Sequence, residues 1–254
     1  MSRSLADWLA HCAAMHPIEI DLSLERVVEV RSRLGLKFDV PVIAVAGRPL
    51  GWSEPFAHAW PVAAIVPENG AVALIRQGKA VVTEYAQDAA MRERNARRLR
   101  EVAVTVLAEI PGTALARDSA GRVTDIAIDH GEFAQLDDTA IAQVVAVMQR
   151  EGMSATVSSI HVNGWFGDHT KLSGARWMLR RLFGRELDAE RQRWVYVGDS
   201  TNDQAMFGYF PLSVGVANLC DFAPALHTWP AYITDGARGA GFAEVAARLL
   251  AAHR

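Results

Sequence analysis

The stretch VGDSTNDQAMF at residues 197–207 decides the fold, because two aspartates and an asparagine follow directly after the apolar run WVYV. Asp199 comes just past this predicted strand, and Asp203 lies in the first turn of the helix that follows. In open α/β sheets, ligands bind beyond the carboxyl ends of the strands. The two carboxylates can therefore converge on a hard cation such as Mg²⁺, and Asn202 can donate to an anion at the helix N-terminus. The alternative is that these residues only cap the helix.

Strand and helix patterns alternate around this stretch. VPVIAVA (40–46) is a continuous apolar run closed by Gly47, which favours a parallel strand covered on both faces. The same rhythm predicts a helix over 171–183 that ends at Gly184, and strands within 193–199 and 212–218. Together these patterns predict a doubly wound α/β core with a parallel sheet.

The middle of the chain has a different pattern, which is typical of an α+β unit. The predicted elements are a helix at 91–110, two strands within 113–129, a helix at 137–152 capped by Asp137 or Asp138, and one strand at 154–162. Asp125 and Asp129 alternate on a strand and are predicted to face solvent. We therefore expect a discontinuous core domain at 1–83 and 167–254, interrupted by an inserted cap domain at 84–166.

Composition excludes several classes of function. The 254 residues carry a formal net charge of −3 with no clustered basic excess, so a nucleic-acid partner is not expected. No run approaches the roughly 20 apolar residues of a membrane span, and the N-terminus lacks the apolar stretch of a signal peptide. Cys12 and Cys220 are far apart and predict two incidental reduced thiols. We expect a cytoplasmic protein, and the sequence gives no indication of its oligomeric state.

VGDSTNDQAMF resembles the fourth motif of the haloacid dehalogenase (HAD) superfamily of phosphohydrolases, in its GDSxND form. Further stretches share the resemblance: PENGA (67–71), SSIHVNGWFGDHTK (158–171) and VGVAN (214–218). It covers nearly the whole chain after residue 40 and is most specific from 158 to 218. The resemblance implies a HAD-like core with an inserted C2-type cap, as in subfamily IIB.

The resemblance also implies a mechanism. In that family an aspartate attacks phosphorus and forms an aspartyl-phosphate, and a second aspartate two residues later is the general acid and base. A Thr or Ser and a lysine hold the phosphate, and Mg²⁺ neutralises its charge. Carried over to this sequence, Lys171 would hold the phosphate, Asp199 and Asp203 would bind Mg²⁺, and Asn202 would support the site.

The first motif departs from the family pattern, because no DxDGT string occurs in the chain. The nearest candidate is IEIDLSLE (18–25), which puts Glu19 at the nucleophile position and Asp21 at the acid/base and metal position. A glutamate is one methylene longer, and a displacement of about 1 Å can cost roughly 100-fold in rate. Two alternatives stay open: an alignment through Asp7, or the absence of the motif.

The second motif is altered as well. Relatives have TGRP or SGRP where this chain has Ala46-Gly47-Arg48-Pro49, and Ala46 has no hydroxyl to offer a phosphate. One hypothesis is a Mg²⁺-dependent phosphatase for a small phosphorylated metabolite, with a sugar phosphate implied by the cap type and with impaired activity. The other is a catalytically inactive protein that binds a phosphorylated ligand or a partner protein.

Five further residues are candidates for contact with a substrate or for structural roles. His161, Asn163 and Trp165 lie on the segment that leads from cap to core, where substrate contact and packing are both open. Asn69, in PENGA, is a candidate for substrate contact. Arg48 could hold its loop or a carboxylate.

Overall fold

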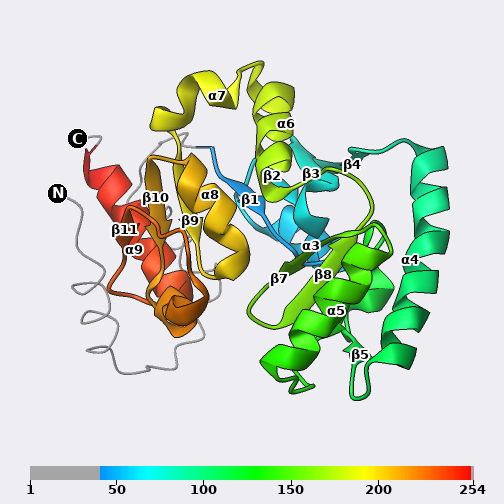
Figure 1. Cartoon of the computed structure of the whole chain (residues 1–254). Helices are drawn as coiled ribbons and strands as arrows, with labels where there is room; N and C mark the ends of the chain where they lie inside the picture. Colours follow the sequence, from blue (N-terminus) through cyan, green and yellow to red (C-terminus); the bar gives the residue numbers. More distant parts are fainter. Residues whose placement is uncertain (1–40, 253–254) are drawn as a thin grey trace. The chain divides into compact units, whose positions relative to one another are not determined.

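The computed structural model describes residues 41–252, which form two compact units at residues 41–187 and 188–252 (Figure 1). We call them the first and the second unit. The predictions for Asp7, Glu19, Asp21 and the first-motif candidate at 18–25 lie outside the described residues. The predicted domain boundaries, at 83/84 and 166/167, stay predictions.

The first unit contains a four-stranded sheet in the order β1-β2-β3-β4. Its strands are β1 (Ile43–Val45), β2 (Ala64–Val66), β3 (Val72–Gln77) and β4 (Ala80–Tyr85). β1 and β2 are parallel, and β3 and β4 form an antiparallel hairpin, in which Gly78 turns with a φ of 62°.

Two helices cover the two faces of this sheet, which explains why its strands are continuous apolar runs. α3 (Leu50–Ala59) packs through Phe56 and Ala57 against Ile65 and Leu74. α6 (Lys171–Phe183) packs through Trp177, Met178 and Leu182 on the opposite face, against residues that include Val45 and Val66. α6 ends at Gly184 in a left-handed conformation, as predicted.

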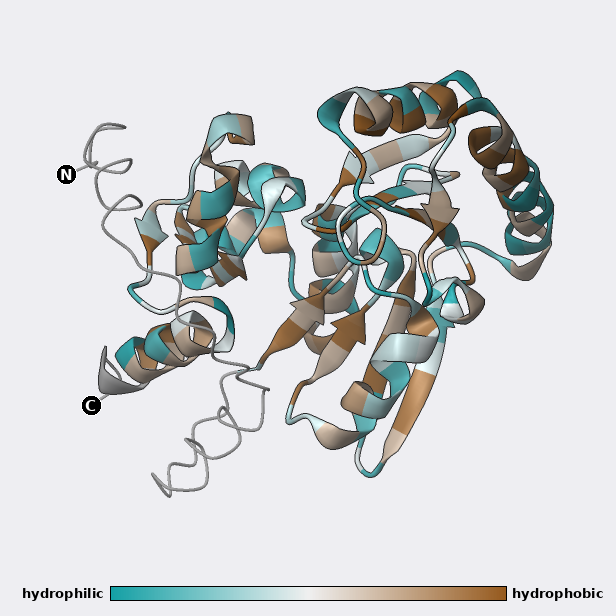
Figure 2. Cartoon of the chain, turned by 90° about the horizontal axis from the view of Figure 1, so that it is seen from below, coloured by the Kyte–Doolittle hydropathy of each residue, from teal (hydrophilic) through white to brown (hydrophobic). Residues whose placement is uncertain are grey.

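A second, antiparallel sheet lies in the same unit in the order β5-β6-β8-β7. Its strands are β5 (Ala114–Leu115), β6 (Asp125–Asp129), β7 (Ser154–Val157) and β8 (His161–Trp165), and η2 (Ser119–Gly121) lies between β5 and β6. α4 (Ala89–Glu109) and α5 (Asp138–Arg150) pack on one face around Val106, Ile128, Met148 and Val162. Both helices mix hydrophobic and hydrophilic residues along their length (Figure 2), as amphipathic helices do. The predicted α+β arrangement is confirmed.

The predicted single strand at 154–162 is wrong, because the chain turns at residues 158–160 and forms two strands, β7 and β8. The turn is Ser-Ser-Ile and carries no glycine, proline or asparagine to signal it. Instead, the Ser158 hydroxyl closes the turn by donating to the carbonyl of His161 at 3.0 Å and accepting from its amide at 3.1 Å.

The second unit has a three-stranded parallel sheet in the order β11-β10-β9. Its strands are β9 (Val195–Gly198), β10 (Leu212–Gly215) and β11 (Tyr232–Ile233). Between and after them lie η4 (Thr201–Asp203), α8 (Gln204–Tyr209), η5 (Ala217–Ala225) and α9 (Arg238–Ala252), while α7 (Leu187–Glu190) and η3 (Arg191–Arg193) precede β9. The parallel strands predicted around the GDSTND stretch are confirmed.

Cys220, in η5, is disulfide-bonded, so the prediction of an incidental reduced thiol is wrong for this residue. Separation along the sequence does not fix separation in the fold, and bonding depends on whether the two Cα atoms come within about 7 Å. In the described part of the chain, no helix combines the length and the apolar character that crossing a membrane requires.

Candidate functional site

The loop after β1 and the 3₁₀ turn after β2 meet at one edge of the first sheet. Because the strands are parallel, their carboxyl ends lie side by side. The amide of Ala46 donates to the carbonyl of Val66 at 2.9 Å, and the amide of Asn69 donates to the carbonyl of Ala46 at 3.0 Å. The altered second motif is therefore held against η1 (Glu68–Gly70).

Two glycines bring the start of α6 to the same edge. Gly70 has a φ of 105°, and a Cβ there would collide with the carbonyl of Thr170. A Cβ on Gly174 would lie 2.8 Å from the Cα of Gly70. Lys171, the first residue of α6, begins the helix after the N-cap Thr170, whose side chain accepts from the amide of Ser173 at 3.1 Å. The first unit thus gathers Ala46, Asn69 and Lys171 near one edge.

The antiparallel sheet turns its second face toward this edge. β6 and β8 direct alternate side chains to that face, away from α4 and α5. Five of these side chains belong to residues that are at most 3% exposed: Asp125, Asp129, His161, Asn163 and Trp165. The prediction that Asp125 and Asp129 face solvent is wrong. Asp125 and Asp129 do lie on the same face of the strand, as the alternation predicts. Neighbouring loops cover that face, however, and the alternation gives no information about such cover.

Arg122 and Asp125 form a buried ion pair at the centre of this region. Arg122 Nη1 donates to both carboxylate oxygens of Asp125, at 2.9 and 3.0 Å, and to the carbonyl of Gly47 at 3.1 Å. The amide groups of Asn69 and Asn163 each donate to Asp125 Oδ2 at 3.4 Å. Burial raises the pKa of Asp125 to about 7, against the opposing charge of Arg122. Sequence reasoning missed Arg122, which follows a turn and belongs to no motif.

Glu68 connects the loop before α3 with the β5–β6 connection. Its carboxylate is fully buried and accepts from the amide of Leu50 at 2.9 Å, from that of Val123 at 3.0 Å and from that of Thr124 at 2.6 Å. The hydroxyl of Thr124 donates to it as well. Glu68, which lies in the PENGA stretch (67–71), therefore joins the two sheets of the unit.

Arg48 and His161 share an acidic neighbour. Arg48 Nη1 donates to Asp118 at 3.3 Å, and its Nη2 lies 3.9 Å from Glu132. His161 Nε2 lies 3.1 Å from the other oxygen of Glu132. Burial, with the nearby charge of Arg122, lowers the pKa of His161. Of the two roles open for Arg48, pairing with a carboxylate is the one the structure has.

Asp129 organises the loop after β6, and removing its carboxylate is expected to destabilise the protein. Burial opposes its ionisation, but hydrogen bonds from the four amides of residues 131–134 outweigh that effect and lower the pKa of Asp129. We expect Asp129→Ala to lower the free energy of unfolding by about 1–3 kcal/mol at pH 7. A carboxylate with a depressed folded pKa contributes stability above its unfolded pKa and loses it as pH falls through the folded pKa.

Urea unfolding of both proteins at pH 7, 5 and 3 checks this prediction. The difference in free energy of unfolding between the native protein and Asp129→Ala should be smaller at pH 3, because the native protein is then losing the contribution of its Asp129 carboxylate. If this difference in free energy is the same at all three pH values, the prediction is contradicted. Asp138→Ala, in the first turn of α5, is the control that removes an acidic residue outside this loop.

In the second unit, Asp203 stabilises the turn after β9. Its Oδ2 accepts from the amides of Asp199, at 2.9 Å, and Ser200, at 3.2 Å, and its Oδ1 accepts from the hydroxyl of Tyr196 at 2.6 Å. Burial, followed by the charge of Asp203, raises the pKa of Tyr196 well above its ordinary value, so this tyrosine stays a neutral donor. Asn202 Oδ1 accepts from the Ser200 hydroxyl at 2.9 Å. Asp203 therefore caps the turn, which is the alternative role that the sequence allowed for it. Binding of a metal ion by Asp203 stays a prediction.

Asp199 is exposed just beyond the carboxyl end of β9, where open α/β sheets bind ligands. Carboxylate oxygens are the donors that Mg²⁺ prefers, so Asp199 and Asp203 have the right chemistry for this ion. Across residues 41–252, however, no three His, Cys, Asp or Glu side chains gather as a metal site would require. A complete site would need a further ligand from outside the described residues.

Comparison with solved structures defines the class of this fold. The chain resembles a sucrose-phosphatase from Synechocystis sp. PCC6803, solved with sucrose and phosphate, at 14% identity and a TM-score of 0.62 over 91% of this chain and 92% of that one. It also resembles a haloacid dehalogenase-like hydrolase from Bacteroides thetaiotaomicron, at 15% identity and a TM-score of 0.55 over 89% and 90%.

A third solved structure places the resemblance in a subclass. It is a HAD subclass IIB sugar phosphatase, with 14% identity and a TM-score of 0.51 over 83% of this chain and 84% of that one. No family model and no curated protein matches the sequence. The chain therefore has the fold of the haloacid dehalogenase superfamily in its IIB-like, capped form, and the fold predicted from the GDSTND stretch is confirmed.

Proposed function

We propose that this protein is a Mg²⁺-dependent phosphatase of reduced activity that acts on a small phosphorylated metabolite, most simply a sugar phosphate. Support comes from the solved neighbours, two of which are named as phosphatases of sucrose phosphate or sugars. The observation that carries the proposal is the position of Lys171, which starts α6 at the edge where β1 and β2 end. A cytoplasmic location stays a prediction.

In the proposed reaction each candidate has one role. Lys171 and Asn202 bind the phosphate. Asp199 and Asp203 hold Mg²⁺, which would neutralise the phosphoryl charge when bound. Asp21 serves as the acid and base and as a further metal ligand, and Glu19 occupies the nucleophile position.

Four residues would act on the substrate side: Arg48, Asn69, His161 and Asn163. Asn69 and Asn163 already donate to Asp125, so they would position the site through that carboxylate and offer their carbonyl oxygens to a ligand. The side chain of Arg48 is about one-third exposed, so a ligand can reach it.

The second candidate function is a catalytically inactive protein that binds a phosphorylated ligand or a partner. Ala46 favours it, because the second-motif position has no hydroxyl, while the loop itself is firmly held. The two proposals differ in turnover and agree on phosphate binding.

Phosphate release from p-nitrophenyl phosphate and a panel of sugar phosphates, with and without Mg²⁺, separates the two. We expect slow, Mg²⁺-dependent turnover that Asp199→Asn abolishes and Ala46→Ser increases by about tenfold or more, since one donor to a phosphoryl oxygen can contribute a factor of 10²–10³. Asp221→Asn, in η5, serves as the matched carboxylate control. Equal rates for the native protein and Asp199→Asn would remove the phosphatase proposal and leave the binding protein.

A further inference from the structure

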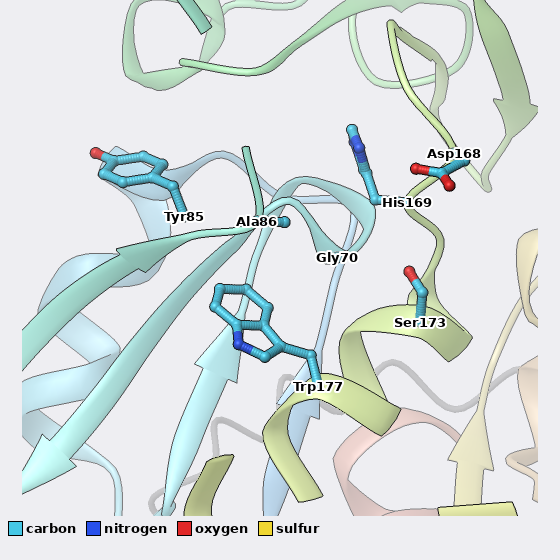
Figure 3. A pocket seen from close by; sticks show the side chains of 7 residues that line it. All are labelled: Gly70, Tyr85, Ala86, Asp168, His169, Ser173 and Trp177. Carbon is cyan, nitrogen blue, oxygen red and sulfur yellow. The ribbon is translucent and has the colours of Figure 1, made fainter. Parts of the chain in front are cut away.

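A pocket of about 320 Å³ lies in the first unit, apart from the residues assigned above to phosphate binding. Figure 3 shows its lining residues, which are Gly70, Tyr85, Ala86, Asp168, His169, Ser173 and Trp177. It lies where β4 leads into α4 and where β8 leads into α6. Its volume falls within the range of small-molecule sites.

The walls of this pocket are held in place by contacts from both segments. Arg92 lies over the ring of Tyr85, 3.8 Å from its centroid. Gln87 Nε2 donates to the carbonyl of Phe166 at 2.8 Å, which ties the segment after β4 to the one after β8. Trp165 Nε1 donates to the carbonyl of His169 at 3.0 Å. A ligand would therefore meet a site that is formed before it binds, which lowers the ordering cost of binding.

His169 is a neutral aromatic residue in the wall of this pocket. Its side chain is 6% exposed and stacks on Trp165, with ring centroids 5.5 Å apart. Its Nε2 is buried and has no hydrogen-bond partner among residues 41–252. Burial lowers the pKa of His169 to about 4, so the ring is neutral at pH 7.

The remaining lining groups set the charge of the preferred ligand. Asp168 is exposed and supplies a carboxylate, and none of the seven lining residues is a lysine or an arginine. In Figure 3 the indole of Trp177 lies on one side of the pocket, with Asp168, His169 and Ser173 on the other. A carboxylate beside an aromatic face attracts a cation and repels an anion.

We infer that this pocket binds a small organic cation, a protonated amine carried on a compact apolar body. The ammonium pairs with Asp168, and the apolar body packs on Trp177. This inference is independent of the proposed phosphatase activity, because Lys171 and the GDSTND residues do not line the pocket.

Isothermal titration of the full chain at pH 7.5 with phenethylamine, phenethyl alcohol and phenylacetate tests the inference. The three probes share one body and differ in charge. Phenethylamine should bind with a Kd on the order of 1 mM, a value that a ligand of this size can reach. The alcohol should bind more weakly, and phenylacetate should not bind detectably.

Variants then locate the binding. Asp168→Asn should weaken phenethylamine binding by about fivefold, the size of a partly exposed ion pair. Ala86→Leu should abolish binding by filling the pocket. Glu101→Gln, on the exposed side of α4, should leave binding unchanged. Equal affinity for the amine and the alcohol overturns the inference. So does amine binding that neither Asp168→Asn nor Ala86→Leu changes. The inference also fails if no phenethylamine binds at a concentration 10-fold above the expected Kd.

Discussion

Replacing Glu68 with alanine is expected to lower the free energy of unfolding by roughly 3–5 kcal/mol, because several buried donors lose their acceptor at once. The amides of Leu50, Val123 and Thr124 all donate to this carboxylate, which is fully buried. The hydrogen bond from the Thr124 amide is buried, and those from Leu50 and Val123 are partly buried. Glu68→Gln should lie between the alanine variant and the native protein, since an amide keeps one oxygen acceptor and turns its NH₂ group toward other donors.

Urea unfolding followed by circular dichroism measures this loss. Glu93→Gln is the matched control, because Glu93 is a largely exposed glutamate of α4 that contacts only Arg97 among the ion pairs of residues 41–252. It should change stability by no more than about 0.5 kcal/mol. If Glu68→Ala unfolds within that margin of the native protein, the carboxylate does not join the two sheets as described.

Replacing Arg122 with methionine is expected to destabilise the protein by roughly 3–5 kcal/mol at pH 8, because it leaves the buried Asp125 without its cation. The guanidinium of Arg122 is 1% exposed and the carboxylate of Asp125 fully buried, so solvent cannot replace the lost interaction. The double variant Arg122→Met/Asp125→Asn should recover part of the loss, since no buried charge is then left unpaired.

The destabilisation caused by Arg122→Met should also depend on pH, and the direction of that dependence follows from the pKa of Asp125. The folded pKa is raised to about 7, above the ordinary value of 3.8. Protonation therefore favours the folded state, and stability falls as pH rises from about 4 through 7. Without Arg122 the pKa rises further, so Arg122→Met should cost less at pH 5 than at pH 8. In the Asp125→Asn variant, the fall in stability with rising pH that comes from Asp125 should be absent. If the stability of this variant falls with pH as steeply as that of the native protein, the raised pKa does not belong to Asp125.

Local patterns predicted most of the fold because they reflect local physics. The apolar run before Gly47, the Asp137 cap and the left-handed Gly184 each depend on neighbours a few residues away, and each is found in the structure. The break at residues 158–160 was missed because Ser158 makes that turn through its side chain, and no residue there has a strong turn preference.

The candidate site was less predictable, because its environment comes from residues far apart in the sequence. Asp125 is buried by Arg122, three residues away, and by Asn69 and Asn163, which are 56 and 38 residues away. An alternating strand pattern cannot distinguish a face covered by solvent from one covered by a polar loop. The motif stretches single out Lys171 and Asp199 as candidates, and their roles stay predictions, whereas the ion pair of Arg122 and Asp125 had no sequence signal.

The contact between Gly70 and Gly174 has a consequence for how such a protein can change over evolutionary time. Neither residue has a side chain to offer a ligand, yet a single methyl group on either one would push α6 away from η1. Lys171, one turn before Gly174, would move with the helix. Gly174 lies outside every motif stretch, so its replacement by alanine could displace the lysine while all motif residues are retained, and a comparison of motifs alone would overlook the loss.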